Sequence, residues 1–188
     1  MFLVRLAVRV GGAAGCYKAA SSGGENAVKL IHLVTADPTV DPDAHIKQNF
    51  KGGVNATLHT WSALMHACHQ GNHSCVQALL NAGANPSQAI TVNQSHLGND
   101  VKIQQSPMSI ARKNNDKECV KILIGCLQRG QQLVGRTVRV EGFRRAEPAI
   151  NGKIGEVLAF DSSTGQCSVK LDLNGKQKMH FLSPTVLV

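Results

Sequence analysis

The side chains with the most reactive chemistry crowd into residues 66–75, which read HACHQGNHSC. Histidine and cysteine are the usual tetrahedral ligands of zinc, so this density raises the hypothesis of a metal site. A zinc ion would require several of these side chains to converge on one point. Whether they can converge depends on the helices and turns that carry them, which the rest of the sequence defines.

A second group of candidate residues, Phe143, Arg144, Arg145 and Lys153, could contact an anion. Arginine binds phosphate and an exposed phenylalanine can stack on a base, so this group is a candidate RNA contact. The same residues could contact a protein or form a solvated loop. The chain carries 20 Lys and Arg against 12 Asp and Glu, a net charge of +8, but the excess is spread along its length. A nucleic-acid partner is therefore the alternative and not the first prediction.

Signatures of the common enzyme and cofactor sites do not occur in the sequence. It has no GxxxxGK[ST] phosphate loop, no HExxH zinc motif and no GxSxG nucleophile elbow. Its acidic residues are few and scattered, which does not favour a general acid and base pair. These observations predict a protein that is not an enzyme, holds no cofactor and acts on no small-molecule substrate.

Residues 1–15 combine arginines with apolar residues and contain no acidic side chain. Arg5 and Arg9 are four residues apart, so a helix would place both on one face. This pattern is typical of an organellar presequence, mitochondrial or plastid, and it also fits a helix that caps a stacked fold. No apolar run reaches the roughly 18 residues that indicate a membrane span. Six Cys without a CxxC motif favour reduced thiols and an intracellular protein, cytoplasmic by default.

Three segments of the chain resemble one another, at residues 16–31, 64–80 and 108–124. In each, a short apolar helix with small residues precedes a polar break, and a second helix carries a central valine. These valines are Val28, Val76 and Val120, spaced 48 and 44 residues apart. Such self-similarity indicates a stack of helix pairs, each of which completes its core against its neighbours.

The sequence also indicates where these helices begin and end. Ser62 and Ser106 are good N-caps, and Pro107 suits the first position of a helix. Gly71 predicts a break inside the second segment, and the polar pair at 114–115 predicts one inside the third.

The second segment resembles the ankyrin repeat, whose pattern is T-P-L-H-x-A-A, a Gly-His turn, V-V-x-L-L and then G-A-D/N-P. Its matching stretches are Ser62–Cys68, Gly71, Val76–Leu80 and Gly83–Pro86. The first and third segments match less fully, as the terminal repeats of a stack do. The resemblance implies about three ankyrin repeats over residues 16–127, with residues 1–15 as the cap or targeting segment.

The repeats depart from the family in their spacing, which is 44–48 residues where ankyrin repeats have about 33. The surplus lies between repeats, at residues 39–59 and 87–105, in polar stretches that contain Pro, Gly and Asn. We expect these insertions to lengthen the loops, called fingers, that project from an ankyrin stack. They are either tolerated surface loops or contacts for a partner.

The ankyrin alignment accounts for most of the histidines and cysteines in the reactive stretch. His66, Cys68 and Cys75 take positions where the family has core residues, and His69 and His73 flank the turn between the helices. Ligands divided between a core face and a turn do not easily converge on one ion. We therefore predict ordinary repeat packing and no metal.

The resemblance also implies where a partner would bind. In ankyrin repeats the first helices and the finger tips form one concave face. On that face we predict contacts to another protein or multiprotein complex by six residues: Trp61, Met65, His69, Gln70, Lys113 and Asn114. Trp61 is the chain's only tryptophan and suits an interface anchor, but it could instead pack its finger onto the next repeat.

The last third of the chain follows a different pattern. Residues 128–135 interrupt the helical pattern and predict a linker, after which apolar residues alternate as in strands. Turns that include Asn-Gly separate five short strand candidates, which predicts a small antiparallel barrel over residues 136–188. The motifs V-R-V-x-G at Val138–Gly142 and N-G-K-x-G-x-V at Asn151–Val157 resemble Src-homology-like barrels, including KOW and Tudor relatives.

Together these patterns predict an α+β multidomain protein: an ankyrin-type helical repeat stack followed by a small five-stranded antiparallel β-barrel. We expect a non-catalytic protein–protein interaction module, an adaptor or a subunit of a larger assembly, that binds through the concave face and the fingers. The alternative is an RNA- or ribonucleoprotein-associated accessory protein that uses the basic C-terminal barrel.

Overall fold

The computed structural model describes residues 14–37, 40, 43, 46–48, 59–96, 99–141, 150–173 and 175–188. The described chain begins with a helix over residues 14–22, followed by α2 over Gly24–Thr35. The next elements, in order, are β1 (Ile46–Gln48), β2 (His59–Trp61), α3 (Ala63–Gln70), α4 (His73–Asn81), β3 (Ile90–His96), β4 (Asn99–Gln105), α5 (Pro107–Lys113) and α6 (Lys117–Leu133). The chain ends with β5 (Thr137–Arg139), β6 (Ile154–Asp161), β7 (Gln166–Leu173), β8 (Lys176–Leu182) and the 3-10 helix η2 (Pro184–Val186).

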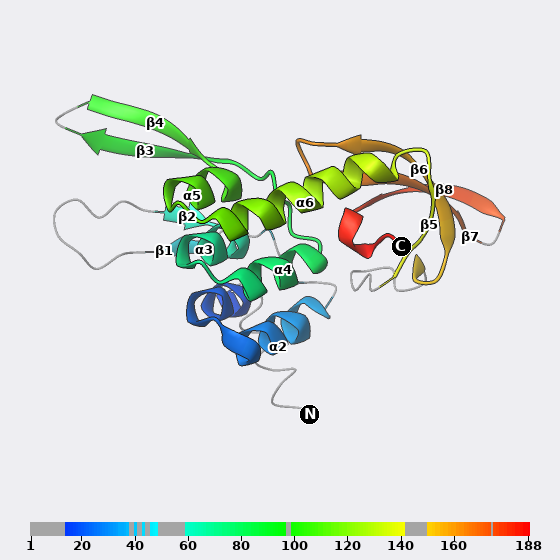
Figure 1. Ribbon diagram of the computed structural model, residues 1–188, viewed down its shortest axis with the longest axis horizontal. Helices are drawn as coiled ribbons and strands as arrows, with labels where there is room; N and C mark the ends of the chain where they lie inside the picture. The colour runs from blue at the N-terminus through cyan, green and yellow to red at the C-terminus, as the bar shows by residue number, and fades with distance from the viewer. Residues whose placement is uncertain are drawn as a thin grey trace.

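The helices of the described chain form three pairs that stack in layers (Figure 1). Residues 14–22 precede α2, while α3 packs on α4 and α5 packs on α6. Across the layers α2 contacts α4, α4 contacts α6 and α3 contacts α5. We call residues 14–22, α3 and α5 the inner helices, and α2, α4 and α6 the outer helices. This stack confirms the predicted repeats, and Val76 in the middle pair has no exposed surface.

The predicted caps and breaks explain where the helices begin and end. The Ser62 hydroxyl accepts a hydrogen bond of 3.4 Å from the first turn of α3, and Ser106 forms a capping box with Ser109. At the break of the middle pair, Gly71 has a φ of 68°, in the left-handed region that favours glycine. At the break of the third pair, Asn115 has a φ of 59°, in the same left-handed region. Asparagine tolerates this region better than most residues and therefore suits the position.

The stretches inserted between the repeats form β-hairpins. β1 pairs antiparallel with β2, where Trp61 lies opposite Ile46. β3 pairs antiparallel with β4 along seven positions, beginning with Ile90 opposite Gln105. Both hairpins leave the stack on the side of the inner helices (Figure 1). Residues 46–48 and 59 of the first predicted finger, and residues 90–96 and 99–105 of the second, are therefore in strands. Residues 39, 41–42, 44–45, 49–58 and 97–98 of the fingers lie outside the described chain.

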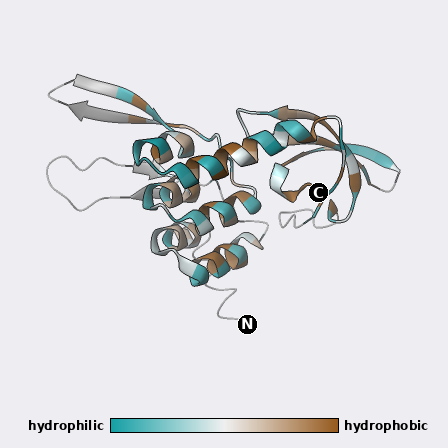
Figure 2. Cartoon of the chain, viewed as in Figure 1, coloured by the Kyte–Doolittle hydropathy of each residue, from teal (hydrophilic) through white to brown (hydrophobic). Residues whose placement is uncertain are grey.

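Small and aliphatic side chains build the core of the stack. Ala20, Ala67 and Ala111 are completely buried in the inner helices, which lets neighbouring helices approach closely. All six cysteines are buried and free of disulfides, so they pack as small apolar residues. Each layer shows hydrophobic and hydrophilic residues on the same helices, the pattern of amphipathic helices (Figure 2). Among the described residues, no helix is long and apolar enough to cross a membrane.

Within the described residues, β5 to β8 form a four-stranded antiparallel sheet in the order β5-β6-β7-β8. The antiparallel C-terminal sheet was predicted correctly, but the structure shows four unclosed strands and does not show the closed five-stranded barrel. The fifth strand candidate lies partly in the helical turn η2 and not in a strand. The end of the chain still pairs antiparallel with β5 and the residues after it: Arg139 and Val188 exchange two backbone hydrogen bonds, and Leu187 bridges Val140. Pro184 explains the difference, because proline cannot donate a ladder hydrogen bond and suits the first position of a helical turn.

Helix α6 runs without interruption through residues 128–133, where the sequence predicted a linker. Gly130 lies on the side of α6 that meets the sheet, and a β-carbon at this position would collide with the Phe160 ring. The carbonyl oxygen of Gly130 also lies 3.8 Å from the Cys167 sulfur, which donates to it. This glycine therefore serves a close helix–sheet contact and does not break the helix.

Two further hydrogen bonds dock the sheet on the outer helices. The guanidinium of Arg129 in α6 donates to the carbonyl oxygen of Leu187 at 2.7 Å. The hydroxyl of Thr185 in η2 donates to the carbonyl oxygen of Leu80 in α4 at 2.9 Å. The sheet thus sits at the ends of the outer helices, away from the fingers (Figure 1).

Candidate functional site

The inner helices end in exposed polar side chains beside the breaks of the repeats. His69 and Gln70 close α3, while Lys113 and Asn114 lie at the end of α5. All four residues are exposed, and the packing of α3 on α5 brings the two helix ends together. Four of the six residues predicted to contact a partner therefore share one accessible surface. We call this surface the inner ledge (His69, Gln70, Lys113 and Asn114).

A direct contact between two repeats orders the inner ledge. The side-chain amide nitrogen of Asn114 donates to the carbonyl oxygen of His69 at 2.9 Å and lies 3.3 Å from the Nδ1 atom of the same residue. The contact joins the second repeat to the third. It holds the two ends of the ledge in a fixed relative position.

The charged side chains of the inner helices are all of one sign. These side chains are Lys18, Arg112 and Lys113, all exposed and all basic. The described residues of the three inner helices include no Asp or Glu. The charge on the described inner helices is therefore positive throughout.

Trp61 does not act as an exposed anchor, which corrects one of the predicted contacts. Its side chain is only 7% exposed. The Trp61 ring meets the His69 ring edge-on at a centroid distance of 5.0 Å, and its Nε1 donates to Gln105 Oε1 at 2.8 Å. Because Gln105 ends β4, Trp61 joins the bases of both fingers to α3. The alternative of local packing, which the sequence left open, fits these contacts.

Met65 is the second correction, because it has no exposed surface and belongs to the core of the stack. The prediction treated one side of α3 as accessible along its length. In a middle repeat, however, neighbours cover the helix on both sides: α5 packs on one, and Tyr17 of the first helix reaches the other through His66. Only the last turn of α3 keeps exposed residues.

A buried pair, Tyr17 and His66, links the first and second repeats. The Tyr17 oxygen lies 2.9 Å from His66 Nδ1, and the two rings stack at a centroid distance of 4.2 Å. Burial, and next the nearby charge of His69, lower the pKa of His66 to about 4. His66 is therefore neutral near pH 7, and we assign its proton to Nε2 so that Nδ1 accepts from the Tyr17 hydroxyl.

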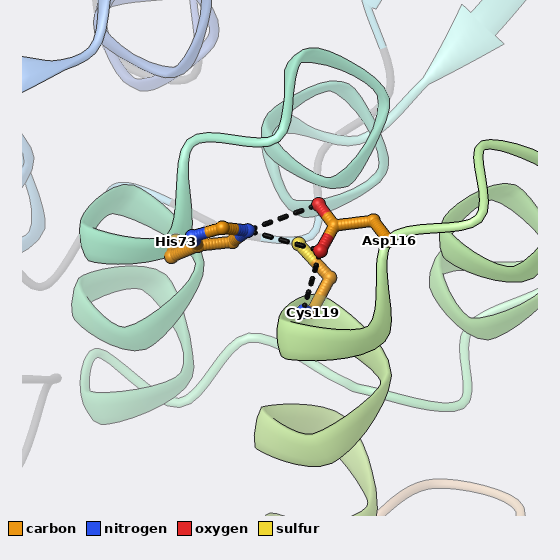
Figure 3. A group of neighbouring side chains, drawn as sticks. All are labelled: His73, Asp116 and Cys119. Atoms are coloured by element: carbon orange, nitrogen blue, oxygen red, sulfur yellow. Dashed lines mark hydrogen bonds and ion pairs between the residues drawn. The ribbon is translucent and has the colours of Figure 1, made fainter.

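Figure 3 shows a second group of polar side chains, between the second and third repeats. His73 Nε2 lies 3.0 Å from each carboxylate oxygen of Asp116. Asp116 is the N-cap of α6, where its Oδ1 accepts the backbone N–H of Cys119 at 3.0 Å. Burial raises the pKa of Asp116, but the hydrogen bonds from Cys119 and the His73 contact outweigh burial and lower it. The nitrogen, oxygen and sulfur atoms of the three side chains all lie within 4.8 Å of one another.

The histidines and cysteines of residues 66–75 have separate partners in the structure. His66 pairs with Tyr17 and His69 with Asn114. The Cys75 sulfur lies 3.9 Å from a carbonyl oxygen of the first helix, and His73 pairs with Asp116. The prediction of packing positions was therefore right for His66 and Cys75. It missed the partners, all of which come from other repeats.

The predicted anion contact falls mostly outside the described chain. Phe143, Arg144 and Arg145 are not among the described residues. Lys153 is partly buried just before β6, where its carbonyl oxygen accepts the backbone N–H of Val140 at 2.9 Å. The anion contact stays a prediction.

Comparison with known proteins identifies the helical part of the chain. A search of curated proteins finds no match. The family model for ankyrin repeats matches residues 16–134 in three copies, which is more than half of the chain. The matched residues are the helix pairs and hairpins described above. On this match, the chain belongs to the ankyrin repeat family.

Proposed function

We propose that this protein is an adaptor, or a subunit of a larger assembly, that binds another protein through its inner helices and fingers. Ankyrin repeats are generally protein–protein interaction modules and are typically non-catalytic. The observation that carries the proposal is the inner ledge, where exposed side chains from two repeats form one surface.

The order of this surface supports a binding role. Binding normally costs free energy because side chains lose rotamer freedom at the interface. The Asn114 contacts to His69 and the packing of Trp61 on the His69 ring restrain the ledge before a partner arrives. A partner would therefore meet a surface that is already arranged.

The charge of the inner helices indicates the chemistry of the partner. Lys18, Arg112 and Lys113 are exposed on helices that contain no acidic residue. Complementary charge speeds association and selects among partners. We infer a partner segment that presents carboxylates and hydrogen-bonding groups to the ledge.

A charge-reversal experiment tests this surface. The full chain and the double variant Arg112→Glu, Lys113→Glu would each be used to capture proteins from a cell extract, followed by mass spectrometry. Lys121→Glu is the matched control, because Lys121 is exposed on the outer helix α6. We expect a protein that binds the unaltered chain and the control but not the double variant. Equal recovery by all three chains would contradict the proposed surface.

One observation favours the alternative, an RNA- or ribonucleoprotein-associated role for the C-terminal sheet. Phe181 and Met179 in β8 are 66% and 47% exposed, and Lys170 of β7 lies opposite Met179. An exposed ring near a basic side chain can stack on a base while the lysine contacts phosphate. In this role Phe143, Arg144, Arg145 and Lys153 stay the predicted anion contacts.

Salt and nuclease distinguish the two roles. Phosphate contacts release counterions, so RNA binding falls steeply as salt rises. If nuclease treatment abolishes capture and Phe181→Ala reduces it, the sheet carries the function through RNA. If capture survives nuclease but not the double charge reversal, the inner ledge carries it through protein.

A further inference from the structure

The His73, Asp116 and Cys119 group offers three kinds of metal-binding atom at one place (Figure 3). We propose that these residues bind a divalent cation of the zinc class between the second and third repeats, with water in the fourth position. This site is independent of the inner ledge. It shares only His73 with the cluster at residues 66–75, because Asp116 and Cys119 come from the next repeat.

The distances suit a small cation. Zinc lies about 2.0–2.3 Å from its ligands, so two ligand atoms of a tetrahedral site are about 3.5 Å apart. The His73 nitrogen is already 3.0 Å from both Asp116 oxygens, and the Cys119 sulfur lies within 4.8 Å of the other two ligand atoms. An ion can therefore replace the contact between His73 and Asp116 after small movements of the side chains.

The backbone already positions the carboxylate and the thiol. Asp116 and Cys119 are three residues apart in the first turn of α6, so their side chains lie on one side of the helix. The Cys119 N–H bonded to Asp116 Oδ1 fixes the orientation of the carboxylate. Hydrogen bonds of this kind hold the ligands of metal sites in place. Oδ2 faces His73 Nε2 at 3.0 Å, so an ion between these two atoms would replace that contact.

The burial of the three residues defines the path to the site. Cys119 has no exposed surface, whereas the side chains of His73 and Asp116 are 44% and 15% exposed. A cation entering from solvent meets the imidazole and the carboxylate first and the sulfur last.

The donor set selects the class of ion. Calcium and magnesium require oxygen ligands, which this group supplies only through Asp116. One imidazole nitrogen, one carboxylate oxygen and one thiolate sulfur are typical ligands of zinc and its transition-metal neighbours. Cobalt(II) can therefore replace zinc as a spectroscopic probe.

The competing explanation is a metal-free helix cap. In that case Asp116 only caps α6 and pairs with His73, and Cys119 only packs in the core. The two explanations differ in what added metal does. A cation that binds the folded protein must raise its melting temperature, because the bound ion stabilises only the native state.

The test uses the full chain after treatment with a chelator. Zinc chloride would be titrated by calorimetry, and cobalt(II) chloride by absorption, where a sulfur-to-metal charge-transfer band reports thiolate binding. We expect one zinc per chain, a higher melting temperature and the cobalt band. His73→Gln should weaken zinc binding by about tenfold or more, since it removes one of three protein ligands. Cys119→Ser should abolish the band, and the control His32→Gln should change neither result.

Three results would overturn the site: no binding by the unaltered chain, binding that His73→Gln leaves unchanged, or a cobalt band that persists in Cys119→Ser. Circular dichroism would establish that each variant is folded. If the buried substitution Cys119→Ser prevents folding, the substitution His73→Gln decides alone, because the His73 side chain is exposed.

Discussion

The repeat stack and the C-terminal sheet build their cores in different ways. In the stack, each helix pair is covered by the next pair, and one continuous core runs from Cys16 to Cys126. The sheet has a second core, and it buries one face against the end of α6 and against η2. Its outward face leaves four large apolar residues exposed: Ile154, Leu158, Met179 and Phe181. The stack is thus supported by its own repetition, whereas the sheet relies on a helix that belongs to the stack.

This difference predicts that the sheet depends on the stack for its stability more than the stack depends on the sheet. Damage to the middle repeat removes neighbours from both sides of the stack and also disturbs the helix on which the sheet rests. Damage to the contact between α6 and the sheet should leave the helix pairs folded. Mutations at matched positions in the two regions can therefore test whether the sheet needs the folded stack in order to fold.

The largest effect is expected for Val76→Asp. Val76 is completely buried in the middle pair, so an aspartate there would be an unpaired charge in the core. We expect a loss of about 4 kcal/mol or more, comparable to the whole stability of a marginal domain. Thermal melting followed by circular dichroism should show no cooperative transition. The neighbouring exposed change Gln77→Asp is the control, and a cooperative melt of Val76→Asp at the control's temperature would refute the repeat packing.

The next largest effect is expected for Gly130→Ala, compared with Gly125→Ala in the same helix. A β-carbon at Gly130 would collide with the Phe160 ring, whereas none of the described atoms lies within 4 Å of a β-carbon at Gly125. Alanine favours a helix by about 1 kcal/mol over glycine, so Gly125→Ala should stabilise the protein slightly. Gly130→Ala should cost about 3 kcal/mol, since overpacking outweighs the helix preference.

Chemical denaturation would measure both glycine variants. If the sheet relies on α6, Gly130→Ala should separate one transition into two, with the sheet unfolding first. A single transition at the position of the Gly125→Ala transition would mean that the sheet does not depend on this contact.

A third effect, of intermediate size, is a dependence of the stack on pH through His66. Burial holds the pKa of His66 at about 4, while an unfolded histidine has a pKa near 6.5. Between these values the unfolded chain binds more protons, so the contribution of His66 to stability falls as pH falls from about 6.5 to 4. Between pH 7 and 4.5 the loss should be on the order of 2 kcal/mol.

The double variant Tyr17→Phe, His66→Leu isolates this contribution. Replacing both partners leaves no unpaired polar group in the core, so the variant should fold. Its free energy of unfolding should fall less with acidification than that of the unaltered chain. Parallel pH curves for the two proteins would show that His66 does not have a lowered pKa.

Much of the stack could be predicted from the sequence because the same local pattern of caps, breaks and apolar residues occurs in each repeat. Ser62, Gly71 and Val76 recur in related forms in the other segments, and the structure uses them as cap, break and core. The strands of the second finger were missed. Their signal was the alternation of Ile90 with Val92 and of Val101 with Ile103, which the polar composition of the stretch concealed.

The contacts that join different repeats could not be predicted. Tyr17 and His66 are 49 residues apart, and His73 and Asp116 are 43 residues apart. No pattern of one sequence gives the register between two layers, so neither pair was expected. The linker predicted over residues 128–135 was wrong for a related reason. A glycine such as Gly130 can indicate either a helix break or a close approach of two elements, and only the position of Phe160 distinguishes the two.

The smallest predicted effect concerns the hydrogen bond from the Thr185 hydroxyl to the Leu80 carbonyl oxygen, which joins η2 to α4. Thr185→Val keeps the shape but removes the hydroxyl, which also lies 2.9 Å from the Ser183 hydroxyl; the Leu80 oxygen retains the backbone N–H of Gly83 as a donor. We expect a loss on the order of 1 kcal/mol, since the net contribution of each hydrogen bond is small. Thr164→Val is the control, because the Thr164 hydroxyl bonds only to Asp161 in an exposed turn of the same sheet among the bonds described. If this contact with the stack stabilises the sheet, Thr185→Val should lose more free energy of unfolding than the control does, as measured by denaturation. Equal losses would mean that α6 stabilises the sheet and that the contact with α4 does not.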